Sequence, residues 1–241
     1  MDLLTAALTW IADPAHWSGP DGIEQRLAEH IGISALSMLI AVAIALPAGL
    51  YIGHSGRGAS FAINLANVGR ALPSLAIIAI VLPTTSAIDP ELGFKVYPTL
   101  IAMVVLAIPP ILVNSYAGIA GADRDLVESA RGMGLRERQI LVGVELPIAL
   151  PVVLGGIRSA GVQVVATATL GAIFGFGGLG RYIVDGVAQR DDGQLFGGVV
   201  LGAVLAIGTE VAFALLQHVS TSPGLRPSEE PSSGQPRAIG A

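Results

Sequence analysis

Five apolar runs of about 20 residues each take up about half of this chain. A helix of that length crosses the roughly 30 Å hydrocarbon core of a membrane, because each residue adds about 1.5 Å. Only 13% of the 241 residues are charged, against about 25% in soluble domains. We therefore expect an all-α membrane protein with five transmembrane helices. The expected spans are residues 31–53, 61–83, 97–119, 148–174 and 195–217.

The spans divide the chain into three parts. Residues 1–30 hold Trp10 and Trp17, which suit the headgroup zone, and they lack the basic start of a cleavable signal peptide. We expect them to form an external interfacial segment. Residues 31–217 make up a transmembrane domain with a charged loop at 120–147. Residues 218–241, rich in Pro, Ser and Gly, are expected to be a disordered cytoplasmic tail.

The placement of basic residues predicts the orientation. With the C-terminus in the cytoplasm, seven of the thirteen Lys and Arg residues lie on the cytoplasmic side and four lie outside. Positive charges favour the cytoplasmic side of a membrane. The loop at 120–147 dominates this bias. We therefore expect the N-terminus outside, and the C-terminus and the charged loop inside.

Residues that would support chemistry on this chain are few. There are no cysteines, which excludes disulfides, thiol catalysis and cysteine metal sites. The four histidines are scattered along the chain, and no G-x-x-x-x-G-K-[ST] nucleotide signature is present. We expect no catalytic site, no metal and no cofactor on this chain, and no nucleic-acid partner. If ATP drives the protein, another chain binds it.

The charged loop is predicted to form a short helix, a turn and a second helix. Asp123 or Asp125 can act as the N-cap. Gly132 and Gly134 each weaken a helix by about 1 kcal/mol relative to Ala, so the first helix should end there. Pro147 opens the next segment and limits helix continuation upstream of it.

Small residues four apart mark one face of the first loop helix. Ala130 and Gly134 would let another protein surface approach the backbone closely. Glu128, Arg131 and Leu135 follow a second face. Such a helix–turn–helix can dock in a groove of a soluble partner and pass on its movement. The alternative is a solvated loop with incidental charge.

The loop resembles a motif of the permease subunits of bacterial ABC importers. That motif reads E-A-A, three residues, G, nine residues, I, any residue, L-P. The matching residues here are Glu128, Ser129, Ala130, Gly134, Val144, Leu146 and Pro147. Ser129 replaces the middle Ala, and Val144 replaces Ile. In the family this motif forms the coupling helix, which sits in a cleft of the ATPase subunit.

This resemblance implies the type I ABC importer permease fold and a set of partners. They would be two ABC ATPase subunits that carry ATP and Mg, an extracytoplasmic substrate-binding protein, a second permease chain and membrane lipid. The permease pair would be a homodimer or a heterodimer, because five spans cannot enclose a pathway alone. The chain would be a multi-pass protein of the bacterial plasma (inner) membrane and would work by alternating access.

A second resemblance concerns the substrate. "GGIRSAGVQVVATATLGAIFGFGGLGRYIVDG" (155–186), "LANVGRALPSLAI" and "IPPILVNSYAGI" are similar to permeases of the glycine betaine, carnitine and choline group of osmoprotectant importers. The similarity covers roughly residues 29–217. The GGLG element also occurs in methionine-type permeases, so another small solute such as an amino acid is the alternative substrate.

Four glycines near the outer end of the fourth span allow two interpretations. Gly175, Gly177, Gly178 and Gly180 can form a turn that returns the chain at the outer surface. They can equally form a flexible outer gate or a contact for the binding protein. Glycine supplies the backbone freedom that either role needs.

Polar residues inside the spans are candidates for a gate or a pathway. Arg70, Arg158 and Glu210 are costly in lipid, so we expect a structural Arg–Glu pair, side chains that snorkel toward the headgroups, or an inner-gate network. Asn114, Gln163 and Thr167 could line a hydrated path or could hydrogen-bond between helices. With only 5% aromatic residues and no visible aromatic cluster, a tight cation–π cage is not expected. A separate binding protein would then supply the selectivity.

Two other classes of membrane protein compete with the importer. An autonomous secondary transporter should carry buried carboxylates, and only Glu210 qualifies. A membrane scaffold would leave the charged loop without a purpose. The importer permease therefore accounts best for the sequence.

Overall fold

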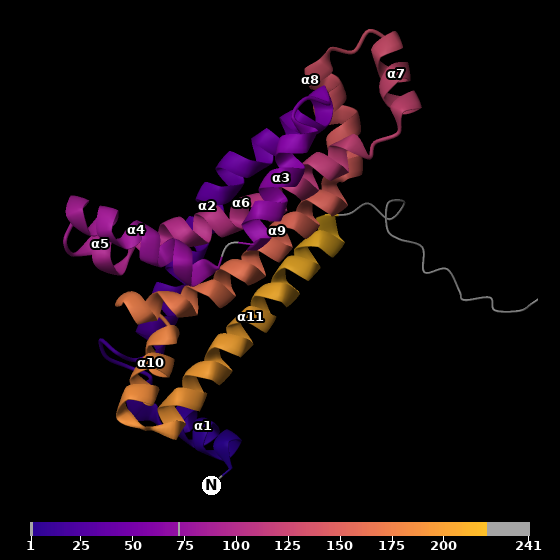
Figure 1. Ribbon diagram of the computed structural model, residues 1–241. Coiled ribbons are helices and arrows are strands. Elements are labelled where there is room, and N and C mark those ends of the chain that lie inside the picture. The colour runs from indigo at the N-terminus through magenta and orange to yellow at the C-terminus, as the bar shows by residue number, and fades with distance from the viewer. Residues whose placement is uncertain (1, 72, 221–241) are drawn as a thin grey trace, which may run out of the picture.

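The computed structural model describes residues 2–71 and 73–220, apart from the side chains of Ala66 and Arg70. Three long helices form its centre: α2 (Ile23–Ser55), α6 (Tyr97–Ala120) and α9 (Leu146–Ala168). Helix α6 packs against both α2 and α9 (Figure 1). The last helix, α11 (Asp192–Ser220), packs against α9 and against the two short helices α1 (Leu3–Ala12) and α10 (Gly180–Gln189).

Small residues allow α2 and α6 to approach closely. They recur at every fourth position along one face of α2: Ser37, Ala41, Ala45, Gly49 and Gly53. A Cβ atom added at Gly49 would lie 2.6 Å from the carbonyl oxygen of Leu112 in α6. One at Gly53 would lie 2.6 Å from Cβ of Ile119. Stripes of small residues are the usual contact surface between helices in lipid, where close packing replaces the hydrophobic driving force.

The expected second span, 61–83, is broken. It consists of α3 (Ala59–Ala71) and α4 (Ser74–Ile88), whose axes meet at 94°. Pro73 lies at the break as the N-cap of α4; its ring disfavours helical backbone in the residue before it and removes one amide donor. In the described chain four helices are long enough to cross a membrane, or five if this bent pair counts as one span.

A short helix follows the bent pair. Helix α5 (Leu92–Lys95) turns back against α4, and the two lie to one side of the bundle (Figure 1). The hydroxyl of Thr85 donates to the carbonyl of Gly93 at 2.6 Å, and no side chain would fit at Gly93. The contact therefore fixes α5 on α4.

The other boundaries agree with the sequence in part. Helix α6 coincides with the expected span 97–119, and α11 extends the span 195–217 by three residues at each end. The expected boundary at residue 30 is wrong, because α2 already begins at Ile23 and runs through it. The expected tail begins inside α11, and its remainder, residues 221–241, lies outside the described residues.

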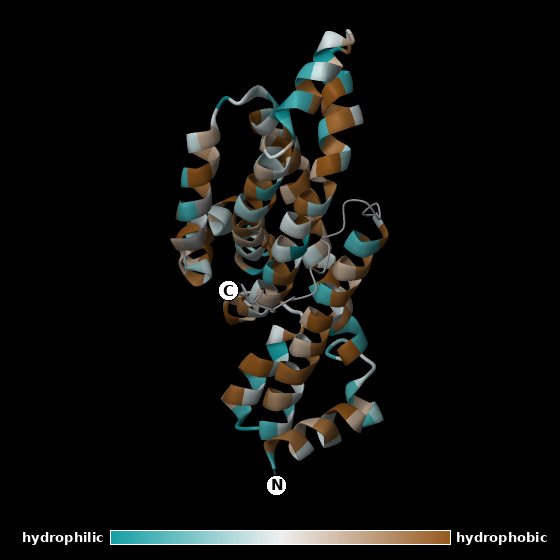
Figure 2. Cartoon of the chain, turned by 90° about the vertical axis from the view of Figure 1, so that its right-hand side faces the viewer, coloured by the Kyte–Doolittle hydropathy of each residue, from teal (hydrophilic) through white to brown (hydrophobic). Residues whose placement is uncertain are grey.

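Apolar side chains cover the outside of the bundle. Figure 2 shows hydrophobic residues along the outward faces of the long helices. On α11, Val204, Ile207 and Leu215 are each more than 60% exposed. A soluble protein rarely leaves so much contiguous apolar surface uncovered, whereas a helix in lipid does.

Candidate functional site

The charged loop lies beyond one end of the bundle, opposite the end that holds α1 and α10 (Figure 1). Its first helix is α7 (Arg124–Gly132). Asp123 is the N-cap, and its carboxylate accepts a hydrogen bond from the backbone N–H of Asp125 at 2.9 Å. The predicted helix start, and its end at the two glycines, are both confirmed.

Helix α7 ends in a Schellman motif. Gly134 has φ +84°, the left-handed region that glycine enters without steric cost. The N–H of Leu135 donates to the carbonyl of Ala130 at 3.2 Å, and that of Gly134 donates to Arg131 at 3.0 Å. These two bonds satisfy the last carbonyls of the helix. Gly134 therefore fixes the direction in which the chain leaves α7.

The second loop helix continues into the membrane span without a break. Helix α8 (Glu137–Ile140) passes into a π-helical turn, η2 (Leu141–Glu145), and then into α9. The expected interruption ahead of Pro147 is therefore wrong. Pro147 stands in the first turn of α9, and the wider π turn accommodates its missing N–H. Single π turns of this kind are common at functional sites.

Exposure identifies which face of α7 another protein could touch. Ala130 is only 3% exposed, so it faces its own chain, and its expected place in a docking face is wrong. Glu128 and Ser129 are exposed, and Met133 is 75% exposed. The rest of the motif lies along η2 and α9: Val144 and Leu146 are half-buried and Pro147 is exposed.

A polar cavity of about 390 Å³ lies between α7 and the adjacent ends of α2 and α6. Its lining includes His54, Glu128, Arg131 and Glu145. Arg131 donates two hydrogen bonds to Glu137, at 2.8 and 2.9 Å. These bonds hold the pKa of Arg131 above its usual value. The ion pair therefore ties α7 to α8 within the loop.

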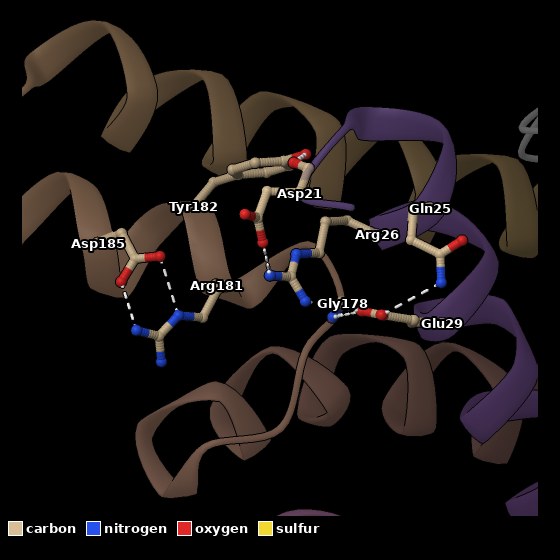
Figure 3. A network of polar contacts seen from close by, with 8 residues as sticks. All are labelled: Asp21, Gln25, Arg26, Glu29, Gly178, Arg181, Tyr182 and Asp185. Atoms are coloured by element: carbon tan, nitrogen blue, oxygen red, sulfur yellow. Dashed lines mark hydrogen bonds and ion pairs between the residues drawn. The ribbon is translucent and has the colours of Figure 1, made fainter. Parts of the chain in front are cut away.

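At the opposite end, side chains from the first turns of α2 hold the glycine loop, residues 175–180 (Figure 3). The carboxylate of Glu29 accepts a hydrogen bond from the N–H of Gly178 at 2.8 Å. Arg26 donates to Glu29 at 3.0 Å and also pairs with Asp21. We call Arg26, Glu29 and the glycine loop the outer clamp.

The buried ring of His30 adds a second contact to the loop. Its Nδ1 accepts from the N–H of Leu179 at 3.3 Å, and its Nε2 lies 3.0 Å from the carbonyl of Val165 in α9. Since Nδ1 accepts, Nε2 carries the proton and donates to Val165. The ring thus joins α2, α9 and the loop.

The glycines of this loop are required by close contacts and by backbone conformation. Gly175 and Gly178 have φ +86° and +71°. A Cβ at Gly177 would lie 2.0 Å from the Glu29 carboxylate, and one at Gly180 would lie 2.2 Å from the carbonyl of Thr169. The loop is therefore a packed turn in this structure. Its roles as an outer gate or a binding-protein contact stay predictions.

The outer clamp yields a stability prediction. Glu29→Ala removes the acceptor of the Gly178 N–H and the partner of Arg26, and a hydrogen bond to a charged group contributes about 2 kcal/mol. We expect the midpoint of thermal unfolding of the purified chain to fall by roughly 4–8 °C. The matched control is Glu24→Ala, an exposed carboxylate of the same helix, which should change the midpoint far less. Equal midpoints for Glu29→Ala and Glu24→Ala would show that the clamp does not stabilise the chain.

A cavity of about 250 Å³ lies inside the bundle between α3, α6 and α9. Asn114, Ser159 and Gln163 supply its polar lining. Pro109 and Pro110 also line it; since neither has an N–H, each leaves a carbonyl of the preceding turn of α6 without its helical partner. The structure therefore brings Asn114 and Gln163 together on a polar cavity.

One of the pathway candidates inside the bundle, Thr167, lies away from the cavity. Asn114 donates to the carbonyl of Pro110 in its own helix at 2.8 Å, rather than to a neighbouring helix. Thr167 is buried at 8% exposure and does not line the cavity. The side chain of Arg70 lies outside the described residues.

The expected ion pair between spans is present. Nε of Arg158 in α9 donates to the carboxylate of Glu210 in α11 at 2.8 Å. Gln217 extends the contact, because its Oε1 accepts from Arg158 at 3.4 Å and its Nε2 donates to the carbonyl of Pro151 at 2.9 Å. The pair therefore joins the last two spans.

An aromatic cluster that the sequence did not reveal lies at the α1 end. The rings of Trp10 and His16 stack at 4.2 Å, and Trp10 meets Tyr182 edge-on at 5.0 Å. Gly197 of α11 packs against the Trp10 ring, and Trp10, His16 and Tyr182 together line a pocket of about 440 Å³. Burial raises the pKa of Tyr182 to about 12, and its hydroxyl donates to the carbonyl of Asp21 at 2.7 Å.

Comparisons with known proteins point in one direction. Residues 41–222 match the family model of binding-protein-dependent transport system inner membrane components. The carnitine transport permease protein OpuCB of Listeria monocytogenes is 35% identical over 84% of this chain and 89% of its own length. The choline transport system permease protein OpuBB of Bacillus subtilis is 34% identical over 84% and 90%. A chain of the inward-facing MetNI methionine ABC transporter has the same fold, with a TM-score of 0.71 and 21% identity over 83% of this chain and 96% of that chain.

Proposed function

Because the chain belongs to the family of binding-protein-dependent transport system inner membrane components, we propose that it imports quaternary-ammonium solutes such as glycine betaine, choline and carnitine. The family and the fold expected from the coupling motif are confirmed. The chain is a multi-pass protein of the inner membrane. Its relatives named for carnitine and choline transport support the substrate class.

The position of α7 is the observation that carries the proposed coupling. The helix stands outside the bundle, packs against α8 and η2, and exposes Leu126 and Met133. An exposed apolar face on a helix held by few contacts suits docking into a groove of another protein. In our proposal that protein is an ABC ATPase, which carries ATP and Mg, and its closure displaces α7.

The remaining partners follow from the shape of the chain. A second permease chain, identical or not, would cover part of the apolar surface of α11, and lipid would cover the rest. The glycine loop lies at the end opposite α7 and would face the binding protein. The four arginines of the 120–147 loop support a cytoplasmic α7, an external N-terminus and a cytoplasmic C-terminus.

The passage of solute would be alternating access. The cavity with Asn114 and Gln163 offers amide and hydroxyl groups but no charged side chain in its described lining. Such a site would bind a zwitterion or a cation weakly, and the binding protein would provide selectivity. Since release into the cytoplasm is required, a weak site suits an importer better than a tight cage.

Uptake of labelled solutes tests this proposal. Cells that carry the operon should accumulate radiolabelled glycine betaine, choline or carnitine at high osmolarity. Accumulation should vanish when the gene for this chain, or for its ATPase, is deleted, because neither subunit transports alone. Proline and methionine serve as comparison solutes. Uptake of an amino acid and of no quaternary amine would refute the substrate class, and uptake that survives loss of the ATPase would favour a secondary transporter.

A further inference from the structure

One histidine at the α7 end has a carboxylate at each ring nitrogen. His54 lies in the last turn of α2. Its Nδ1 is 2.6 Å from Oε2 of Glu145 in η2, and its Nε2 is 3.2 Å from Oε2 of Glu137 in α8. The His54 side chain is 15% exposed and that of Glu145 is 6% exposed. The ring is therefore held inside the protein between two different turns.

The contact continues into α7. Glu137 also accepts two hydrogen bonds from Arg131, through Nε and Nη2. The four groups Glu145, His54, Glu137 and Arg131 form a continuous series, which we call the charge chain. It begins at the start of α9, passes through the end of α2, and reaches the first loop helix.

The ring of His54 reaches both carboxylates because its two nitrogens lie on different edges of the ring. Its Nδ1 is within hydrogen-bond distance of Glu145, and its Nε2 is within ion-pair distance of Glu137. The charge chain therefore alternates carboxylates with nitrogen-bearing groups.

A cavity separates α7 from α2 over part of their facing surfaces. In the described chain α7 packs mainly against α8 and η2, and the cavity of about 390 Å³ lies between α7 and the ends of α2 and α6. The charge chain bridges this space through the contacts of Glu137 with Arg131 and His54.

Glu145 is a buried carboxylate at the end of the π turn η2. Its sequence neighbours Val144 and Leu146 are half-buried, whereas Val142 and Gly143, earlier in the same turn, are exposed. In the importer motif its position is the variable one between Val144 and Leu146. The motif therefore does not account for a buried carboxylate there, whereas the contact with His54 does.

We propose that His54 is a positioning residue for coupling, which transmits the displacement of α7 to α2 through Glu137 and holds α2 to α9 through Glu145. The inference rests on the proposed docking of an ATPase on α7. Without the histidine, the ATPase would still bind and hydrolyse ATP, but α2 would no longer follow α7.

The test uses the complete transporter in liposomes, with its binding protein, and compares solute uptake with ATP hydrolysis. For His54→Gln, whose single amide cannot contact Glu137 and Glu145 from opposite sides as the ring does, we expect ATPase binding and ATP hydrolysis within about twofold of the unmodified complex. Solute transported per ATP should fall about tenfold, within the range that substitutions along a coupling network produce. Glu137→Gln, at an exposed position that folding tolerates, should give the same loss.

Controls separate coupling from folding. His54→Arg supplies several N–H donors that can contact both carboxylates, and it should recover much of the transport per ATP. Glu91→Gln removes an exposed carboxylate paired with Lys95, far along the chain from the loop, and should leave the ratio unchanged. If solute transported per ATP is unchanged in both His54→Gln and Glu137→Gln, the role of His54 is refuted but the proposed function stands. Equal losses of hydrolysis and uptake would have the same meaning. An unmodified chain that binds no ATPase would overturn the proposed function as well.

Discussion

Replacing Gly134 by aspartate is expected to lower solute uptake by more than about 100-fold, since an unpaired charge in an interface costs several kcal/mol. Gly134 has φ +84° and open space around the position of a Cβ atom, so the aspartate does not clash within the chain. It would stand at the end of α7, on the surface proposed to enter the ATPase. Uptake in cells, normalised to the amount of chain in the membrane, measures the effect.

Two further measurements locate the cause of the Gly134→Asp defect. Gly134→Ala introduces the same left-handed strain without a charge and should retain a large part of the uptake. Because the chain has no cysteine, Met133→Cys gives a single label site on the exposed face of α7. ATPase binding should protect this cysteine from a maleimide, and Gly134→Asp should abolish the protection. Normal uptake in Gly134→Asp would contradict the coupling role of the loop.

The parts of the fold that local signals determine could be predicted from the sequence. Asp123 caps the start of α7 with its side chain, as predicted. Gly134, which has no side chain, adopts the left-handed conformation that ends the helix. The long apolar runs located α6 and α11 to within a few residues. The break at Pro73 was not predicted, because an apolar run indicates how long a span is but not whether its helix axis changes direction within it.

Contacts between distant segments could not be predicted in the same way. His54 and Glu145 are 91 residues apart, and Glu29 and Gly178 are 149 apart. Nothing in the local sequence of either partner indicates the other. His54 stood at a span end, where a solvated histidine is unremarkable, and only the packing of α2 against α6 brings it to the loop.

The pair of Arg158 with Glu210 was foreseeable for a different reason. Charged residues inside spans are so costly that the few present are expected to pair. The fourth expected span contains Arg158 and the fifth contains Glu210, so a pair between these two spans was one of the possibilities. Ala130 shows the limit of such arguments. A residue as small as alanine fits equally well on a face that docks to a partner and on a face that packs within the chain. The structure places Ala130 against its own chain.

The same pair gives the second large effect. Glu210→Ala leaves the guanidinium of Arg158 in the membrane without its carboxylate partner, and among the described residues its remaining hydrogen-bond partner is Gln217. We expect the amount of membrane-inserted chain to fall about fivefold or more, because destabilised membrane proteins are cleared by proteolysis. Quantitative immunoblots of membranes measure the abundance, and uptake per inserted chain measures transport separately.

A double substitution distinguishes a structural pair from a gate. Arg158→Gln combined with Glu210→Gln removes both charges and permits an amide–amide hydrogen bond, so abundance should return close to that of the unmodified chain. If the pair is structural, transport per inserted chain stays near normal in Glu210→Ala, since the surviving molecules have the same pathway. Full abundance of Glu210→Ala with transport lost would instead place Arg158 and Glu210 in a gate, where the pair must break and re-form as the protein changes state.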